Sequence, residues 1–90
     1  MISLEAYLRM FDEHGGTDVV YLRNHWQRFR TTKAIFEQGR SATAGKKVLD
    51  VGAHWLHQAL LFALDGYTVT AADLPDTMNA ANVVSAALGL

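Results

Sequence analysis

The stretch KKVLDVGAHWLHQALLFALDGYTVTAAD, residues 46–73, decides the fold of this 90-residue chain. Its first apolar run, residues 48–51, leads into a turn at Gly52. A mostly apolar segment follows at 55–64, and a second short apolar run occupies 67–72. Length and period predict a strand, a tight turn, a helix, a turn and a second strand. This order is typical of a nucleotide-binding α/β unit with a parallel sheet.

We therefore predict an α/β fold, in which N-terminal helices precede a partial Rossmann-like parallel sheet in the order β-α-β-α. Residues 1–40 form the helical extension, and residues 45–90 form the start of the core. The run 48–51 lacks polar alternation apart from Asp50, which predicts a strand covered on both faces. Two strands leave sheet edges open, so we expect the core to need further chain or a partner, with a homo-oligomer as one solution.

The helical extension predicts two helices. Ser3 can cap the first, which ends at Gly15-Gly16. Thr17 can cap the second, a long amphipathic helix expected over residues 18–38. A last helix, capped by Asp76 or Thr77, is expected near the C-terminus. The apolar side chains of the long helix recur at steps of three and four, apart from one longer step at Lys33: Val19, Leu22, Trp26, Phe29 and Phe36.

Composition excludes several classes of protein. No apolar run reaches the roughly 18–20 residues that span a bilayer, and the N-terminus lacks the features of a signal peptide. The chain has no cysteine, so it has no disulfides or thiolate metal sites, and a cytoplasmic location is expected. All eight Lys and Arg lie at or before Lys47, and the segment after it has four acids and no Lys or Arg. A basic helical half beside an acidic α/β half could suit an anionic partner, but solvated helix faces are the favoured interpretation, and nucleic-acid binding is not favoured.

Two acids stand at the ends of the two predicted strands. Parallel strands end at one edge of a sheet, so Asp50 and Asp73 should face a common crevice, where a carboxylate can accept two hydrogen bonds from a ribose diol. Gly52 would let the backbone approach a ligand closely. Asp73 could instead cap the turn before Leu74. Asp50 could order its own turn through backbone amides.

This segment, with Leu74 and Pro75, resembles the start of class I S-adenosylmethionine-dependent methyltransferases. Their first motif is a hydrophobic strand that runs into an acid-x-Gly-x-Gly-x-Gly turn, and a second acid closes the next strand. The resemblance implies that the methionine portion of S-adenosylmethionine lies against the first turn and that the second acid accepts the ribose hydroxyls. The implied cofactor-binding residues are Asp50, Gly52, Ala53, His54, Asp73 and Leu74.

The chain departs from that motif at two positions, because His54 and Leu56 stand where the second and third glycines would be. A side chain at 54 would crowd a pyrophosphate, which favours S-adenosylmethionine over NAD. His54 either contacts the ligand or fills the space that a glycine would leave. His54 and His57 are three residues apart at the start of a helix, but no third ligand is visible, so no metal site is predicted.

The resulting hypothesis is a methyltransferase of unknown acceptor, represented here by its cofactor-binding part. The family's acceptor and catalytic residues usually follow a third strand, so the catalytic residues are unknown and the 90 residues alone are expected to be inactive. The alternatives are an NAD-type dinucleotide-binding domain and a non-catalytic oligomerising module.

Tyr21, His25 and Arg28 share one helix face, which favours exposure to solvent. The resemblance allows Tyr21 or Arg28 to reach a carboxylate instead.

Overall fold

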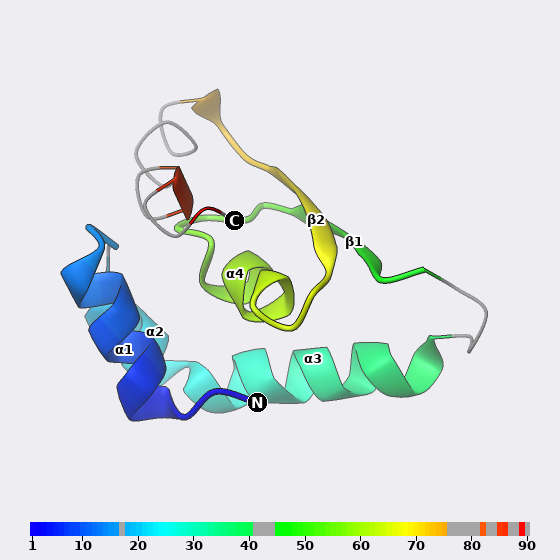
Figure 1. Ribbon diagram of the computed structural model, residues 1–90, viewed down its shortest axis with the longest axis horizontal. Helices are drawn as coiled ribbons and strands as arrows, with labels where there is room; N and C mark the ends of the chain where they lie inside the picture. Colours follow the sequence, from blue (N-terminus) through cyan, green and yellow to red (C-terminus); the bar gives the residue numbers. More distant parts are fainter. Residues whose placement is uncertain (17, 41–44, 76–81, 83–84, 87–88, 90) are drawn as a thin grey trace.

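A computed structural model describes residues 1–16, 18–40, 45–75, 82, 85–86 and 89 of the chain. It is a mixed structure of helices and a two-stranded parallel sheet. The last predicted helix falls mainly on residues outside the described ones. In chain order the elements are α1 (Leu4–Glu13), α2 (Val19–Asn24), α3 (Trp26–Gly39), β1 (Lys47–Val51), α4 (His57–Ala63) and β2 (Thr68–Ala72) (Figure 1).

The sheet pairs β1 with β2 in parallel, from Lys47 opposite Thr68 to Val51 opposite Ala72. The prediction of a strand covered on both faces was wrong, because exposed and half-buried residues alternate along each strand. The inner face packs towards α4, where Val69 contacts the hydrophobic core. On the outer face Leu49 remains 67% exposed and Val51 75% exposed. Only one face of this sheet is therefore part of the core.

The first helix begins and ends as predicted. Ser3 caps α1, since its Oγ accepts a hydrogen bond from the amide of Ala6 at 3.2 Å. After the helix, Gly15 adopts φ +78°, a conformation that glycine takes at little cost. Gly16 lies so close to Phe11 that a Cβ there would overlap the phenyl ring and the backbone carbonyl. The two glycines thus turn the chain tightly beneath a core residue.

The prediction of one long second helix was wrong, because the chain forms α2 and α3 with a break at His25. Thr17 lies outside the described residues, and Asp18 caps α2 by accepting from the amide of Tyr21 at 3.3 Å. Neither glycine nor proline marks the break. Its consequence is tertiary: α2 packs against α1, whereas α3 packs against α4 (Figure 1). A straight helix would have to forgo one of these contacts.

The core joins the helical extension to the crossover helix. Tyr7, Phe11, Leu22, His57 and Leu61 have the largest fully buried side chains. The rings of Tyr7 and Phe11 meet edge to face, with centroids 4.9 Å apart, a favourable aromatic geometry. α4 contributes almost no solvent-facing surface, because most of its residues are apolar and buried. No helix in the described part of the chain has the length and apolar character needed to cross a membrane.

A buried hydroxyl fastens α1 to α4. The Tyr7 hydroxyl donates to the backbone carbonyl of His57, and burial raises the pKa of Tyr7 well above its usual value, so the donor proton is retained. Replacing Tyr7 by phenylalanine should lower the free energy of unfolding by about 1–3 kcal/mol, because a buried carbonyl loses its partner. Urea unfolding of the variant would measure this.

Tyr67→Phe is the matched control for this substitution. The Tyr67 hydroxyl donates to a Glu37 carboxylate oxygen at 3.1 Å, and that carboxylate keeps Lys33 as a partner and remains in part solvated. Its loss should therefore cost less. Equal effects of the two substitutions would contradict the structural role of the buried Tyr7 bond.

A buried lysine fastens α3 to the turn between α4 and β2. Lys33 lies between Phe29 and Phe36, where the regular spacing of apolar residues in the helix is interrupted, and its side chain is only 3% exposed. Its Nζ lies 2.8 Å from Oε1 of Glu37 and 2.9 Å from Oδ2 of Asp65. Burial alone would lower the pKa of Lys33, but the hydrogen bonds to the two carboxylates outweigh it and raise that pKa. In return, hydrogen bonding to Lys33 lowers the pKa of each carboxyl.

Candidate functional site

A cavity of about 260 Å³ lies between the α2–α3 pair and the turn that follows β1. Four of the six residues predicted to bind a cofactor line it: Asp50, Gly52, Ala53 and His54. The volume is slightly below the roughly 300–1,000 Å³ of most small-molecule pockets. The cavity is therefore of a size for a small chemical group rather than for a whole drug-sized ligand.

Asp50 offers a hydrogen-bond acceptor without a donor. It is the penultimate residue of β1, is half-buried, and lines the cavity. Its Oδ2 is buried and, in the part of the chain that the structure describes, accepts no hydrogen bond. Burial and, to a smaller extent, the negative charge of Asp73 raise the pKa of Asp50. A buried polar atom of this kind costs free energy until a donor reaches it.

Asp73 follows β2 and organises two turns. Its Oδ2 accepts from the backbone amide of His54 at 2.7 Å, and its Oδ1 accepts from the amide of Leu74 at 2.7 Å. These two bonds, that from His54 being the stronger influence, lower the pKa of Asp73. The turn-capping role weighed for Asp73 is thus present. It does not exclude binding, because each carboxylate oxygen has a second lone pair.

The turn after β1 is tied to the end of β2 by three successive amides. Gly52 and Ala53 both donate to the carbonyl of Ala72, at 2.7 and 3.0 Å, and His54 donates to Asp73. All three N–H groups are thus satisfied inside the protein. A phosphate-binding turn instead aims such amides at its ligand. This turn is organised to hold its own shape.

The backbone of this turn is left-handed at three alternate positions. Gly52 has φ +74°, His54 φ +53° and Leu56 φ +68°. Residues with a Cβ adopt such values at a cost of about 1–2 kcal/mol each, and they persist where surrounding structure imposes them. Leu56 is 3% exposed and packs in the core, which can offset that cost. His54 is exposed, and its ring centroid lies 5.5 Å from that of Tyr21.

The guanidinium of Arg28 lies in the helical wall of the cavity, where contacts with neighbouring side chains fix its position. Nη2 of Arg28 donates to the Tyr21 hydroxyl at 2.8 Å, and its Cζ lies 5.1 Å from the centroid of the Phe29 ring. The sequence favoured a solvent-exposed face for Tyr21 and Arg28. The structure places both in the cavity wall, with Tyr21 half-buried and Arg28 reaching solvent. In the sequence, their separation of seven residues indicated only that Tyr21 and Arg28 lie on one helix face. Whether that face lines a cavity or is exposed depends on what packs against it.

Several cavity residues were not predicted. Thr32 and Phe29 come from α3, and His57 and Gln58 come from the first turn of α4. The Gln58 side chain donates to the carbonyl of Phe29 at 3.1 Å, which joins these two walls. No sequence motif indicates such residues, because they meet only when α3 packs on α4.

Two predicted residues lie outside the cavity lining. Asp73 reaches the site through its bond to His54, while the Leu74 side chain is 72% exposed and only its amide contributes. Within the described ranges, no group of three or more His, Asp or Glu side chains is arranged to hold a metal ion.

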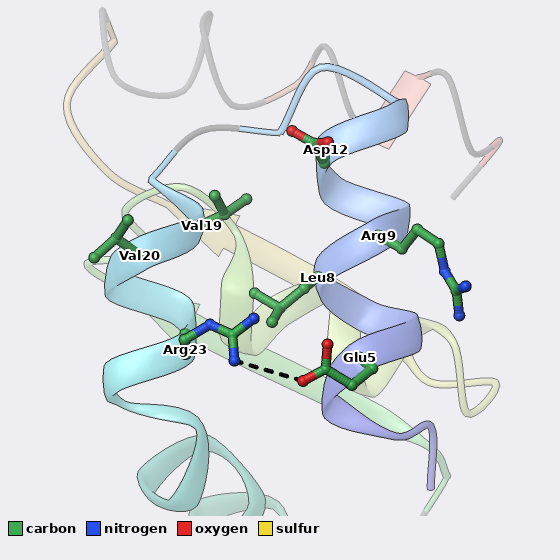
Figure 2. Close-up of a pocket in the computed structure, with 7 residues that line it drawn as sticks. All are labelled: Glu5, Leu8, Arg9, Asp12, Val19, Val20 and Arg23. Atoms are coloured by element: carbon green, nitrogen blue, oxygen red, sulfur yellow. Dashed lines mark hydrogen bonds and ion pairs between the residues drawn. The ribbon is translucent and has the colours of Figure 1, made fainter.

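A separate groove of about 430 Å³ lies between α1 and α2 (Figure 2). Its floor includes Leu8, and Val19 and Val20 line the α2 side. Arg23 and Glu5 pair across it at 3.5 Å, but both side chains are more than half exposed, so the pair adds little stability. The groove contains none of the predicted site residues. It is therefore a less suitable candidate than the cavity at Asp50.

Chemically, the cavity at Asp50 presents a carboxylate from the sheet and a guanidinium from the helices, and the rings of Tyr21 and Phe29 also line it. It can bind and orient a polar ligand, but the described residues around it include no activated nucleophile. Comparisons of this chain with protein-family models, with curated proteins and with solved structures find no match.

Proposed function

We propose that this chain is the cofactor-binding part of a class I S-adenosylmethionine-dependent methyltransferase, built on a Rossmann-like β1-α4-β2 unit. One observation carries the proposal: the left-handed backbone at 52, 54 and 56, directly after Asp50. These are the positions at which the family's motif has its three glycines. At two of these positions the chain has His54 and Leu56, whose backbone is in the left-handed conformation that glycine adopts at little cost.

The residues present fit the cofactor. The buried Oδ2 of Asp50 needs a donor, and the ammonium group of the methionine portion is one. Asp73 retains lone pairs for ribose hydroxyls at the neighbouring strand end. Two carboxylates near each other also favour a ligand with a sulfonium charge. When bound, the cofactor supplies an electrophilic methyl group, and the chain's own residues bind and orient it.

The NAD-type alternative is less well supported by the turn. The amides of Gly52, Ala53 and His54 already donate within the protein, so they are not free to cradle a pyrophosphate. The nearby carboxylates Asp50 and Asp73 would also repel it.

The alternative of a non-catalytic oligomerising module draws on the exposed outer face of the sheet, with Leu49 and Val51. The absence of cysteine supports a cytoplasmic protein, and the methyl acceptor is left open by this proposal.

Titration calorimetry of the 90-residue chain with S-adenosylmethionine, S-adenosylhomocysteine and NAD tests the proposal. We expect both adenosyl ligands to bind with a stoichiometry of one and NAD to give no heat. Light scattering in parallel separates the oligomerising alternative, which predicts assembly and no affinity for any of the three. Binding of NAD, or no binding of the adenosyl ligands at millimolar concentration, would refute the methyltransferase proposal.

A further inference from the structure

The groove between α1 and α2 is a surface that the proposed function does not use (Figure 2). Its floor and one wall are apolar, with Leu8 between the helices and Val19 and Val20 on α2. Leu8 is buried in the core, whereas Val20 is 66% exposed. An apolar groove beside an exposed valine can take up apolar side chains from another protein molecule.

Charged side chains of both signs surround this apolar strip. Glu5 and Arg23 pair with one another where α1 begins and α2 ends. Arg9 and Asp12 also line the groove and are exposed, and neither belongs to an ion pair within the described part of the chain. Figure 2 shows the Arg9 side chain extending away from α2, where another molecule can reach it. One positive and one negative charge are therefore available on the same helix.

The spacing of these two charges suits a second copy of the chain. Arg9 and Asp12 are three residues apart and lie on one face of α1. If two copies of this helix run antiparallel and cross between residues 10 and 11, position 9 of each lies opposite position 12 of the other. Each Arg9 then meets an Asp12, and a two-fold axis makes the two ion pairs reciprocal. The surface thus satisfies its own charges.

Other partners fit the groove less well. Its described lining has two acids and two bases, so it carries no net charge that would attract nucleic acid, an anionic membrane or a highly charged peptide. The chain has a formal net charge of −1, so two copies repel one another only weakly. α1 has ten residues and is about 15 Å long, which limits the area that two copies can bury. The contact therefore belongs to the weak class of protein interfaces.

We infer that two copies of this chain associate through the groove between α1 and α2, with Arg9 of each copy paired to Asp12 of the other and Val20 buried in the contact. This surface differs from the outer face of the sheet, because the described lining of the groove includes no residue of β1 or β2. It also shares no described lining residue with the cavity at Asp50. Association and ligand binding can therefore be measured separately.

Sedimentation equilibrium of the 90-residue chain and of two charge-reversed variants tests the inference. We expect the wild type to dimerise with a Kd of about 10–100 µM. Arg9→Glu places only acids across the axis and Asp12→Arg places only bases there, so each variant alone should dimerise at least about tenfold more weakly. An equimolar mixture of the two should form a heterodimer with nearly wild-type affinity, because each variant then faces the opposite charge. This recovery would also show that both variants are folded.

Two control substitutions lie outside the groove. Arg30→Glu reverses an exposed charge on α3, and Val51→Asp changes the outer face of the sheet. Both variants should dimerise as the wild type does. A wild-type chain that stays monomeric at about 1 mM would refute the inference.

The inference would also fail if Arg9→Glu and Asp12→Arg each dimerise like the wild type, or if their mixture does not associate. Loss of the dimer in Val51→Asp, with no effect of Arg9→Glu, would assign the association to the sheet instead. None of these results bears on the methyltransferase proposal, which depends on the calorimetry.

Discussion

Replacing Lys33 by alanine should lower the free energy of unfolding by about 3 kcal/mol, at the lower end of the loss seen when one partner of a buried ion pair is removed. The Lys33 side chain is 3% exposed and its ammonium holds Glu37 and Asp65 together. Its removal leaves the two carboxylates facing each other without a cation. Because both remain in part solvated, the loss is smaller than for a fully buried pair. Denaturant unfolding at neutral pH measures it.

The pH dependence of the same effect gives a second measurement. The pKa values of Glu37 and Asp65 are lowered in the folded chain, so their contribution to stability is present above about pH 4, the range of unfolded carboxyls, and is lost as pH falls through the folded values. The difference between wild type and Lys33→Met, which keeps the apolar stem, should therefore shrink in acid. Arg30→Ala, an exposed change on the same helix, should cost under about 0.5 kcal/mol. A Lys33 effect equal to that of Arg30 would contradict the structure.

Replacing Asp50 by asparagine should weaken S-adenosylmethionine binding at least about tenfold and yet raise the stability of the free chain, by up to about 1 kcal/mol. Both effects follow from one environment. Burial and the charge of Asp73 raise the pKa of Asp50, so the ionised carboxylate destabilises the fold at every pH above that value. The neutral amide avoids this cost, but it can no longer pair with an ammonium. Calorimetry and thermal unfolding of the same sample measure the two effects.

Acidification should reproduce the binding effect in the wild-type chain. Affinity is expected to fall as pH decreases through the raised pKa of Asp50, whereas the Asp50→Asn variant should lack this component. Asp65→Asn is the control with the opposite sign on stability, because Asp65 pairs with Lys33 outside the cavity. It should destabilise the chain and leave the affinity unchanged. A stabilised Asp50→Asn variant with unaltered affinity would remove Asp50 from the binding site.

Local chemistry explains what the sequence could predict of the fold. The cap at Ser3, the glycines after α1, and the two short strands around an apolar helix are all specified by neighbouring residues. The break at His25 could not be predicted in this way. The apolar row continues through it at helical spacing, and only the separate packing of α2 on α1 and of α3 on α4 requires it. The ion pair of Lys33 could not be predicted either. In the sequence Lys33 only interrupts the spacing of the apolar residues, and its partner Asp65 lies far along the chain.

Four of the residues predicted for the site line one cavity, but the contacts that they make could not be predicted. The sequence allowed Asp50 to order the turn after β1, but Asp73 does so, because parallel pairing brings the end of β2 beside that turn. Asp50 is left with a buried oxygen that accepts nothing from the described residues. Arg28 and Tyr21 could not be assigned to the cavity from periodicity, since the same face would be exposed if α3 packed elsewhere. Non-local packing thus decides which polar groups are satisfied.

Side chains at positions 54 and 56 also affect the thermodynamics of recognition. A glycine-rich loop samples many shapes and becomes rigid only around its ligand, at an entropic cost. Here the backbone at His54 and Leu56 is left-handed. Leu56 packs in the core and the His54 amide donates to Asp73, and these contacts restrict the conformations of the loop. The chain incurs that conformational restriction during folding rather than at the encounter with a ligand. Ligand binding at this turn would then use a preformed site rather than an induced fit.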